Sequence, residues 1–158
     1  IFLQSRKSHL IFKCSVIGEL SFAKYDTINT NWLPSGITYH SASDSILTLY
    51  RNQNQNSQYR LRLISKDVSG SSHKDILFEM GDIDTTYYGI YGLSEHNNSL
   101  FMLVVKDGED ALITMDYNTL EIQSTEMVGD STVVGIAVLN DALYLSFRDR
   151  RIEKFKDL

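Results

Sequence analysis

The sequence has very little cysteine and proline: its 158 residues include only Cys14 and Pro34. A single cysteine excludes an intrachain disulfide, so a packed core must hold the fold, as is more typical of a reducing compartment such as the cytoplasm. Cys14 lies in the apolar run of residues 10–14, and no activating partner is evident nearby. We therefore predict a buried free thiol rather than a nucleophile.

Long apolar runs and an excess of basic residues are also missing. No run approaches the ~20 residues that a membrane-spanning helix requires. The formal net charge is −5, whereas sequence-independent binding of nucleic acid requires a basic surface. We expect neither a membrane nor a nucleic acid as partner. With 42% hydrophobic and 22% charged residues, the composition is that of a folded globular protein.

The chain also has no long segment with helical periodicity. Short stretches alternate between polar and apolar residues, as at residues 19–25 and 59–64, which is typical of half-buried strands. Residues 117–128 fit a short helix less well than a strand, because Thr119, Ile122 and Thr125 favour extended backbone. Asn, Asp, Ser and Gly supply the turns. The sequence therefore predicts an all-β fold.

Apolar strands, polar reversals and acidic turns return at regular intervals. Asp26, Asp67, Asp116 and Asp157 are roughly 41 to 49 residues apart, within the ~40–50 residues of a four-stranded propeller blade. Gly36, Gly89 and Gly135 follow a similar rhythm at the expected first strands. We predict one β-propeller region over residues 1–158, with four-stranded antiparallel sheets in four blade-like units. These units cover residues 1–35, 36–82, 89–131 and 134–158, the first and last incomplete.

Three segments give the chain a resemblance to the β-propeller superfamily, closest to its kelch-like and galactose-oxidase-like branch. Tyr25-Asp26 precedes Trp32 at the kelch spacing, and we expect the segment from Trp32 to Gly36 to form the turn between units. Residues 134–145 look like the first two kelch strands, while residues 115–121 resemble the Asp-x-x-Thr turn of quinoprotein-like propellers. The double glycine of kelch repeats is absent.

The resemblance implies a scaffold that recruits partners, in some kelch proteins as a substrate receptor for ubiquitin ligases. Rings of this kind usually have six or seven blades, so the sequence indicates a segment of a larger propeller, completed by further blades of the parent chain or by other subunits. A small ring and a β-sandwich remain alternatives.

No motif for catalysis, a metal or a cofactor is evident. The four histidines, His9, His40, His73 and His96, show no zinc-ligand spacing, and we expect His40 and His96 to be surface turn residues. The acidic segment of residues 107–110 lacks the pattern of a calcium loop. We therefore expect no cofactor and no enzymatic activity.

Antiparallel strands would place the loops after the second strands and the loops between units at one end of the ring. This predicts a candidate loop surface for a protein or peptide partner, since exposed Tyr and Arg are favoured at such interfaces. The alternative is a carbohydrate-binding, small-molecule-binding or enzymatic propeller whose site is completed elsewhere. The candidate surface residues are Arg51, Tyr87, Tyr88, Lys106, Asp107, Arg148 and Arg150.

Overall fold

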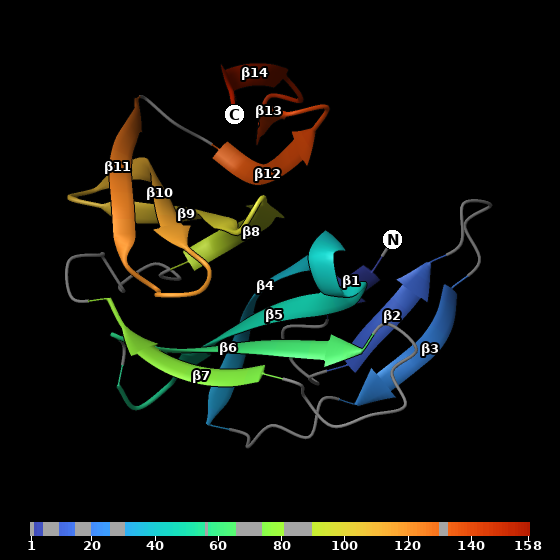
Figure 1. Cartoon of the computed structure of the whole chain (residues 1–158). Helices are drawn as coiled ribbons and strands as arrows, with labels where there is room; N and C mark the ends of the chain where they lie inside the picture. The colour runs from blue at the N-terminus through green and yellow to red at the C-terminus, as the bar shows by residue number, and fades with distance from the viewer. Residues whose placement is uncertain are drawn as a thin grey trace. The chain divides into compact units, whose positions relative to one another are not determined.

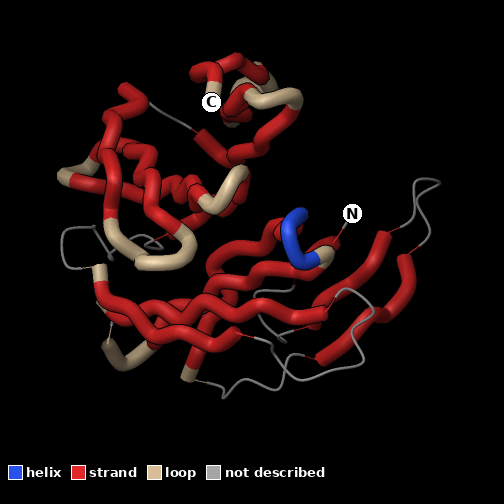
Figure 2. The backbone as a smooth tube through the Cα atoms, viewed as in Figure 1, coloured by secondary structure: helices blue, strands red, loops and turns tan. Residues whose placement is uncertain are grey.

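The computed structural model describes the backbone of residues 2–4, 10–14, 20–25, 31–55, 57–65, 74–80, 90–129 and 133–158. Within these residues the chain is all-β, with a single short 3-10 helix, η1 (Ser41–Ser43), as Figures 1 and 2 show. The chain divides into two compact units, Ile1–Met80 and Gly81–Leu158. Each is described by itself below as unit 1 and unit 2.

Unit 1 contains two antiparallel sheets among its described residues. The first has the order β1-β2-β3, and the second has the order β4-β5-β6-β7. The first strands of the two sheets, β1 and β4, contact each other. The strands are β1 (Phe2–Gln4), β2 (Leu10–Cys14), β3 (Leu20–Tyr25), β4 (Trp32–His40), β5 (Ser45–Asn52), β6 (Gln58–Ser65) and β7 (Lys74–Glu79).

Unit 2 repeats this arrangement with a four-stranded and a three-stranded sheet. The strands again follow one another in chain order, and the first strands of the two sheets, β8 and β12, contact each other. The first sheet contains β8 (Ile90–His96), β9 (Ser99–Lys106), β10 (Glu109–Asp116) and β11 (Ile122–Gly129). The second contains β12 (Val133–Leu139), β13 (Ala142–Phe147) and β14 (Ile152–Asp157).

Burial along the strands follows their position in the sheet. In β9 and β10 five consecutive residues are buried, whereas exposure alternates along the outer strand β11. A strand that is buried on both faces consists of consecutive apolar residues. A strand with one solvent-exposed face alternates between apolar and polar residues. The expected strand in residues 117–128 is confirmed as β11. The strands of each sheet follow one another in chain order, and the first strands of neighbouring sheets contact each other. Both features favour the propeller over the sandwich, whose strands follow Greek-key connections.

Three hairpins of unit 2 turn through two residues that both have positive φ. These pairs are Asn97-Asn98, Asp107-Gly108 and Asn140-Asp141. Such turns match the twist of paired strands and select Asn, Asp and Gly, as the sequence indicated. Asp116 ends β10, and its Oδ1 accepts the N–H groups of Asn118 (2.7 Å) and Thr119 (2.8 Å). The expected Asp-led turn is therefore confirmed here.

A bulge recurs in the first strand of three sheets, immediately before a glycine. The register shifts between Pro34 and Gly36, between Ile90 and Gly92, and between Val133 and Gly135. The glycine of β8 at this position is Gly92, while Gly89, the glycine expected to follow the repeat, lies outside the described residues. A Cβ at Gly135 would lie 2.8 Å from Ser146 Oγ, and one at Gly92 would lie 3.1 Å from Ile136 Cγ2 on β12. Close packing at both positions therefore requires glycine, which has no side chain.

The expected turn from Trp32 to Gly36 was also wrong, because these residues belong to β4. Trp32 packs on Tyr50 of β5, and the Arg60 guanidinium lies 5.6 Å from the centre of the indole ring. The apolar contact and the cation thus hold Trp32 inside a new sheet rather than at a hinge. Asp26 and Asp67, two of the repeat acids, lie outside the described residues, as do His9 and His73.

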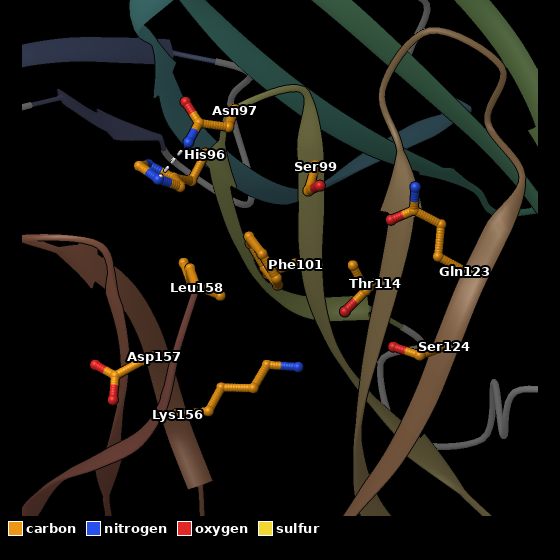
Figure 3. Close-up of a pocket in the computed structure, with 10 residues that line it drawn as sticks. All are labelled: His96, Asn97, Ser99, Phe101, Thr114, Gln123, Ser124, Lys156, Asp157 and Leu158. Carbon is orange, nitrogen blue, oxygen red and sulfur yellow. Dashed lines mark hydrogen bonds between the residues drawn. The ribbon is translucent and has the colours of Figure 1, made fainter.

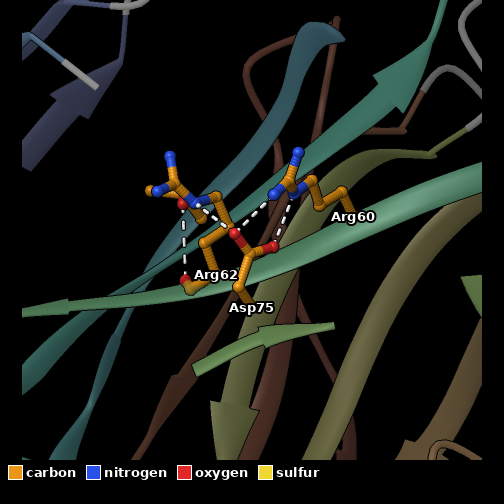
Figure 4. Close-up of polar contacts among 4 residues, drawn as sticks. Arg60, Arg62 and Asp75 are labelled. Carbon is orange, nitrogen blue, oxygen red and sulfur yellow. Dashed lines mark hydrogen bonds and ion pairs between the residues drawn. The ribbon is translucent and has the colours of Figure 1, made fainter. Parts of the chain in front are cut away.

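Across β6 and β7, Asp75 binds two arginines (Figure 4). Its carboxylate accepts two hydrogen bonds from Arg60, at 2.5 and 2.6 Å, and lies 3.4 Å from Arg62 Nε. The bidentate pair has the planar geometry that makes Arg–carboxylate contacts strong. Arg62 is only 8% exposed, so Asp75 neutralises a cation that is largely removed from water.

Candidate functional site

The predicted loop surface is built at one end of unit 2. The turn between β9 and β10 carries Asp107 and Gly108, with φ of 52° and 83°. The turn between β13 and β14 is closed by Arg150 N–H donating to Phe147 O (3.0 Å) and by Phe147 N–H donating to Arg151 O (2.9 Å). Both turns therefore have defined backbone conformations.

Side-chain contacts further fix the second turn. The Arg151 guanidinium lies over the Phe147 ring at 4.3 Å from its centre and pairs with Asp149 (3.1 Å) and Glu153. Its hydrogen bond to Glu153 raises the pKa of Arg151 above its ordinary value. Arg148 and Arg150 are exposed in the same turn, and the structure shows no ion pair for either among the described residues. Arg151 thus stabilises the turn, whereas the other two arginines point their charge at solvent.

Contacts between the two sheets show that both turns lie at the same end. Val133 N–H, at the start of β12, donates to the carboxylate of Asp110 at the start of β10 (3.2 Å). Val133 also pairs with Phe147 at the end of β13. At the other end of the sheets, His96 Nε2 lies 3.0 Å from Asp141 Oδ1. We call the end with the turns of residues 106–109 and 147–151 the loop end of unit 2.

The structure thus brings together four of the predicted residues, Lys106, Asp107, Arg148 and Arg150, on two neighbouring turns. Arg51 lies on β5 in unit 1, close to the corresponding loop of its own sheet. Tyr87 and Tyr88 lie outside the described residues.

A cleft lined by both polar and apolar groups lies at the opposite end of unit 2, and sequence analysis missed it (Figure 3). It has a volume of about 340 Å³ and is open to solvent. Its lining comes from the β8–β9 turn, from β9, β10 and β11, and from the end of β14. The lining residues are His96, Asn97, Ser99, Phe101, Thr114, Gln123, Ser124, Lys156, Asp157 and Leu158.

The cleft begins where the apolar packing between the sheets ends. Phe101, Leu103 and Leu112 of the first sheet pack against Leu143 and Leu145 of the second. Further along the same strands, polar residues replace these apolar ones, so the two sheets no longer fill the space between them. No single residue signals the cleft in the sequence, because its residues are spread over positions 96 to 158.

The two described histidines differ in burial. His40 was expected at the surface but is only 4% exposed, and its Nδ1 lies 2.7 Å from Ser43 Oγ in η1. The short 3-10 turn folds back over the ring, which the polar sequence of residues 41–45 did not indicate. His96 is half-buried beside Asp141. Among the described residues, no group of three or more His, Cys, Asp and Glu side chains is arranged to hold a metal ion.

Two tyrosines of unit 2 have strongly perturbed ionisation. Burial raises the pKa of the Tyr91 hydroxyl far above its ordinary value, and the Asp110 carboxylate beside it adds to the effect. Burial and the charge of Glu95 raise the pKa of Tyr117. Both phenols therefore stay neutral and act as structural groups at neutral pH. In the described part of the chain, no helix is long and apolar enough to cross a membrane.

No protein-family model and no curated protein sequence matches this chain. Solved structures do match it. A catalytically inactive H270A variant of virginiamycin B lyase from Staphylococcus aureus, with quinupristin, is 18% identical over 98% of this chain and 51% of its own, with a TM-score of 0.56. The Cps50 (Swd1) β-propeller domain of Myceliophteria thermophila is 10% identical over 97% of this chain and 64% of its own, with a TM-score of 0.47.

The chain spans about half the length of the lyase structures it matches. At these identities the likeness concerns the fold alone. Together with the sheet order and the contact between the first strands of neighbouring sheets, it agrees with the predicted β-propeller type of architecture, while nothing distinguishes the kelch-like branch from others. The chain is an all-β protein of propeller type.

Proposed function

We propose that this chain is part of a β-propeller scaffold whose loop end in unit 2 binds a protein or peptide partner. The observation that carries the proposal is the pair Arg148 and Arg150, exposed in a turn that Arg151 and Phe147 hold in one conformation. An exposed guanidinium binds a carboxylate through two parallel hydrogen bonds, and Arg is favoured at interface hot spots. A fixed turn lowers the entropy lost on binding.

The charge of the partner follows from the two turns. Acidic side chains would face Arg148 and Arg150, and a basic side chain would face Asp107 on the neighbouring turn. Such a mixed pattern gives orientation and selectivity more than raw affinity. The net charge of −5 makes the polyanionic backbone of a nucleic acid a poorer partner than a short acidic peptide segment.

Selection of a random peptide library on the immobilised chain tests this proposal. We expect enriched peptides to carry Asp or Glu, and their binding to weaken as salt increases. The double variant Arg148→Glu/Arg150→Glu should reduce binding at least about tenfold. The charge-preserving variant Arg148→Lys/Arg150→Lys is the matched control and should retain most of it. Absence of any enriched peptide, or equal binding by both double variants, would overturn the proposal.

A further inference from the structure

The cleft of unit 2 is distinct from the loop end, because it lies at the other end of the same two sheets. Its floor is the edge of the apolar packing around Phe101, and Leu158 adds a second apolar group. A volume of about 340 Å³ is at the small end of the range in which proteins bind small molecules. The cleft can therefore take a compact ligand but not a folded partner.

The charged groups around the cleft are already paired within the protein. Lys156 binds Glu126 across the two sheets, and Asp157 pairs with Lys154 at 2.5 Å. His96 lies beside Asp141 and Asn97. In Figure 3 the Lys156 side chain extends from β14 toward the strands of the other sheet. Because these pairs neutralise the charges of the lining, an ionic ligand gains little, and a neutral one is favoured.

The remaining polar groups are hydroxyls and amides. Thr114 on β10 is more than nine-tenths buried, and its Oγ1 has no hydrogen-bond partner among the described residues. Ser99 and Gln123 also line the cleft, from β9 and β11. A buried hydroxyl without a partner is costly. Neighbouring atoms cover Oγ1, so a ligand must displace them to supply the missing donor or acceptor.

We propose that this cleft binds a neutral monosaccharide-sized ligand with several hydroxyl groups. The hydroxyls of Thr114 and Ser99 and the amide of Gln123 would exchange hydrogen bonds with the ligand hydroxyls. Phe101 and Leu158 would contact its less polar face. The small volume and the neutralised rim favour this class over an anion, and the mixed lining suits a ligand with both hydroxyl groups and a less polar face.

Saturation-transfer NMR with the intact chain and the methyl glycosides of glucose, galactose, mannose, fucose and N-acetylglucosamine tests the proposal. We expect at least one glycoside to bind with a millimolar or lower dissociation constant. Thr114→Val keeps the side-chain shape but removes the hydroxyl, and should weaken binding about tenfold. Gln123→Ala removes an exposed amide and should weaken binding without affecting folding.

Thr125→Val is the matched control, since Thr125 is exposed on β11 and does not line the cleft. It should bind as the wild type does. Circular dichroism of each variant confirms that the sheets are intact. Failure of the folded wild-type chain to bind any of the five glycosides overturns the proposal, as does equal binding by all three variants.

Discussion

Replacing Gly92 with alanine tests how closely the two sheets of unit 2 approach each other. The added Cβ would lie 3.0 Å from Leu103 Cδ1 and 3.1 Å from Ile136 Cγ2, both shorter than ordinary van der Waals contact. Leu103 is fully buried, so its side chain has no solvent to move into. The variant must therefore separate β8 from β12 or distort the side chains between them.

The expected size of the effect is the difference of two opposing terms. Overpacking of a filled core costs typically about 1–3 kcal/mol. Alanine also lowers the conformational entropy of the unfolded chain. Where the native backbone can hold alanine without strain, this stabilises the folded state by about 0.4–1 kcal/mol and offsets part of the cost. We expect Gly92→Ala to lower the free energy of unfolding by about 1–2 kcal/mol. Urea unfolding followed by far-UV circular dichroism measures it, since the single tryptophan, Trp32, belongs to unit 1.

A double-mutant cycle with Ile136→Ala identifies the cause. Removing Ile136 Cγ2 relieves one of the two close contacts, so Gly92→Ala should cost at least about 0.5 kcal/mol less in that background. Gly108→Ala is the control: it is strained by its φ of 83° but has open space around it, so it should be additive with Ile136→Ala. If Gly92→Ala proves neutral, or costs the same in both backgrounds, the close approach of β8 and β12 is refuted.

Three further predictions concern named polar groups. Because the pKa of Tyr91 is raised in the folded state, its contribution to stability is present below the ordinary tyrosine pKa of about 10 and lost as pH rises above it. Tyr91→Phe should flatten the decline of the free energy of unfolding in urea titrations above that pH, and an unchanged slope would contradict this. Asp116→Ala removes the acceptor for two turn N–H groups and should cost about 1 kcal/mol in urea unfolding, whereas Asp116→Asn should cost less; equal costs would exclude the acceptor role. Asp75→Ala removes the carboxylate that pairs with the largely buried Arg62 and should cost about 1–3 kcal/mol, read from Trp32 fluorescence. If Asp75→Ala leaves the free energy of unfolding unchanged, the Arg62 charge does not depend on the Asp75 carboxylate for its stabilisation.

Strands and tight turns could be predicted from the sequence, because local chemistry decides them. Continuous apolar residues in β9 and alternation in β11 follow directly from the number of covered faces. A turn was expected over residues 106–110, and Asp107-Gly108 forms it, because both residues tolerate positive φ. Two of the predicted surface turns, which carry Asp107 and Arg148, lie at the same end of unit 2, because each joins the second and third strands of an antiparallel sheet.

Other features depend on contacts between distant residues. Trp32 looked like a hinge residue, yet packing on Tyr50 and the Arg60 cation place it within β4. His40 looked exposed, yet η1 covers it. Gly89 matched the spacing of the repeat, but the bulge occurs at Gly92. In each case, the partner that decides the outcome is not adjacent in the sequence.

The sequence by itself determined that this protein is all-β, where most of its described strands begin and end, and that its sheets must cover one another. These properties follow from side-chain alternation and turn chemistry, which act over a few residues. Only the tertiary structure decided that Gly92 meets Ile136, that Asp75 holds two arginines, and that a cleft lies between β11 and β14. These features depend on the register and distance between strands, which are set by packing across the whole unit.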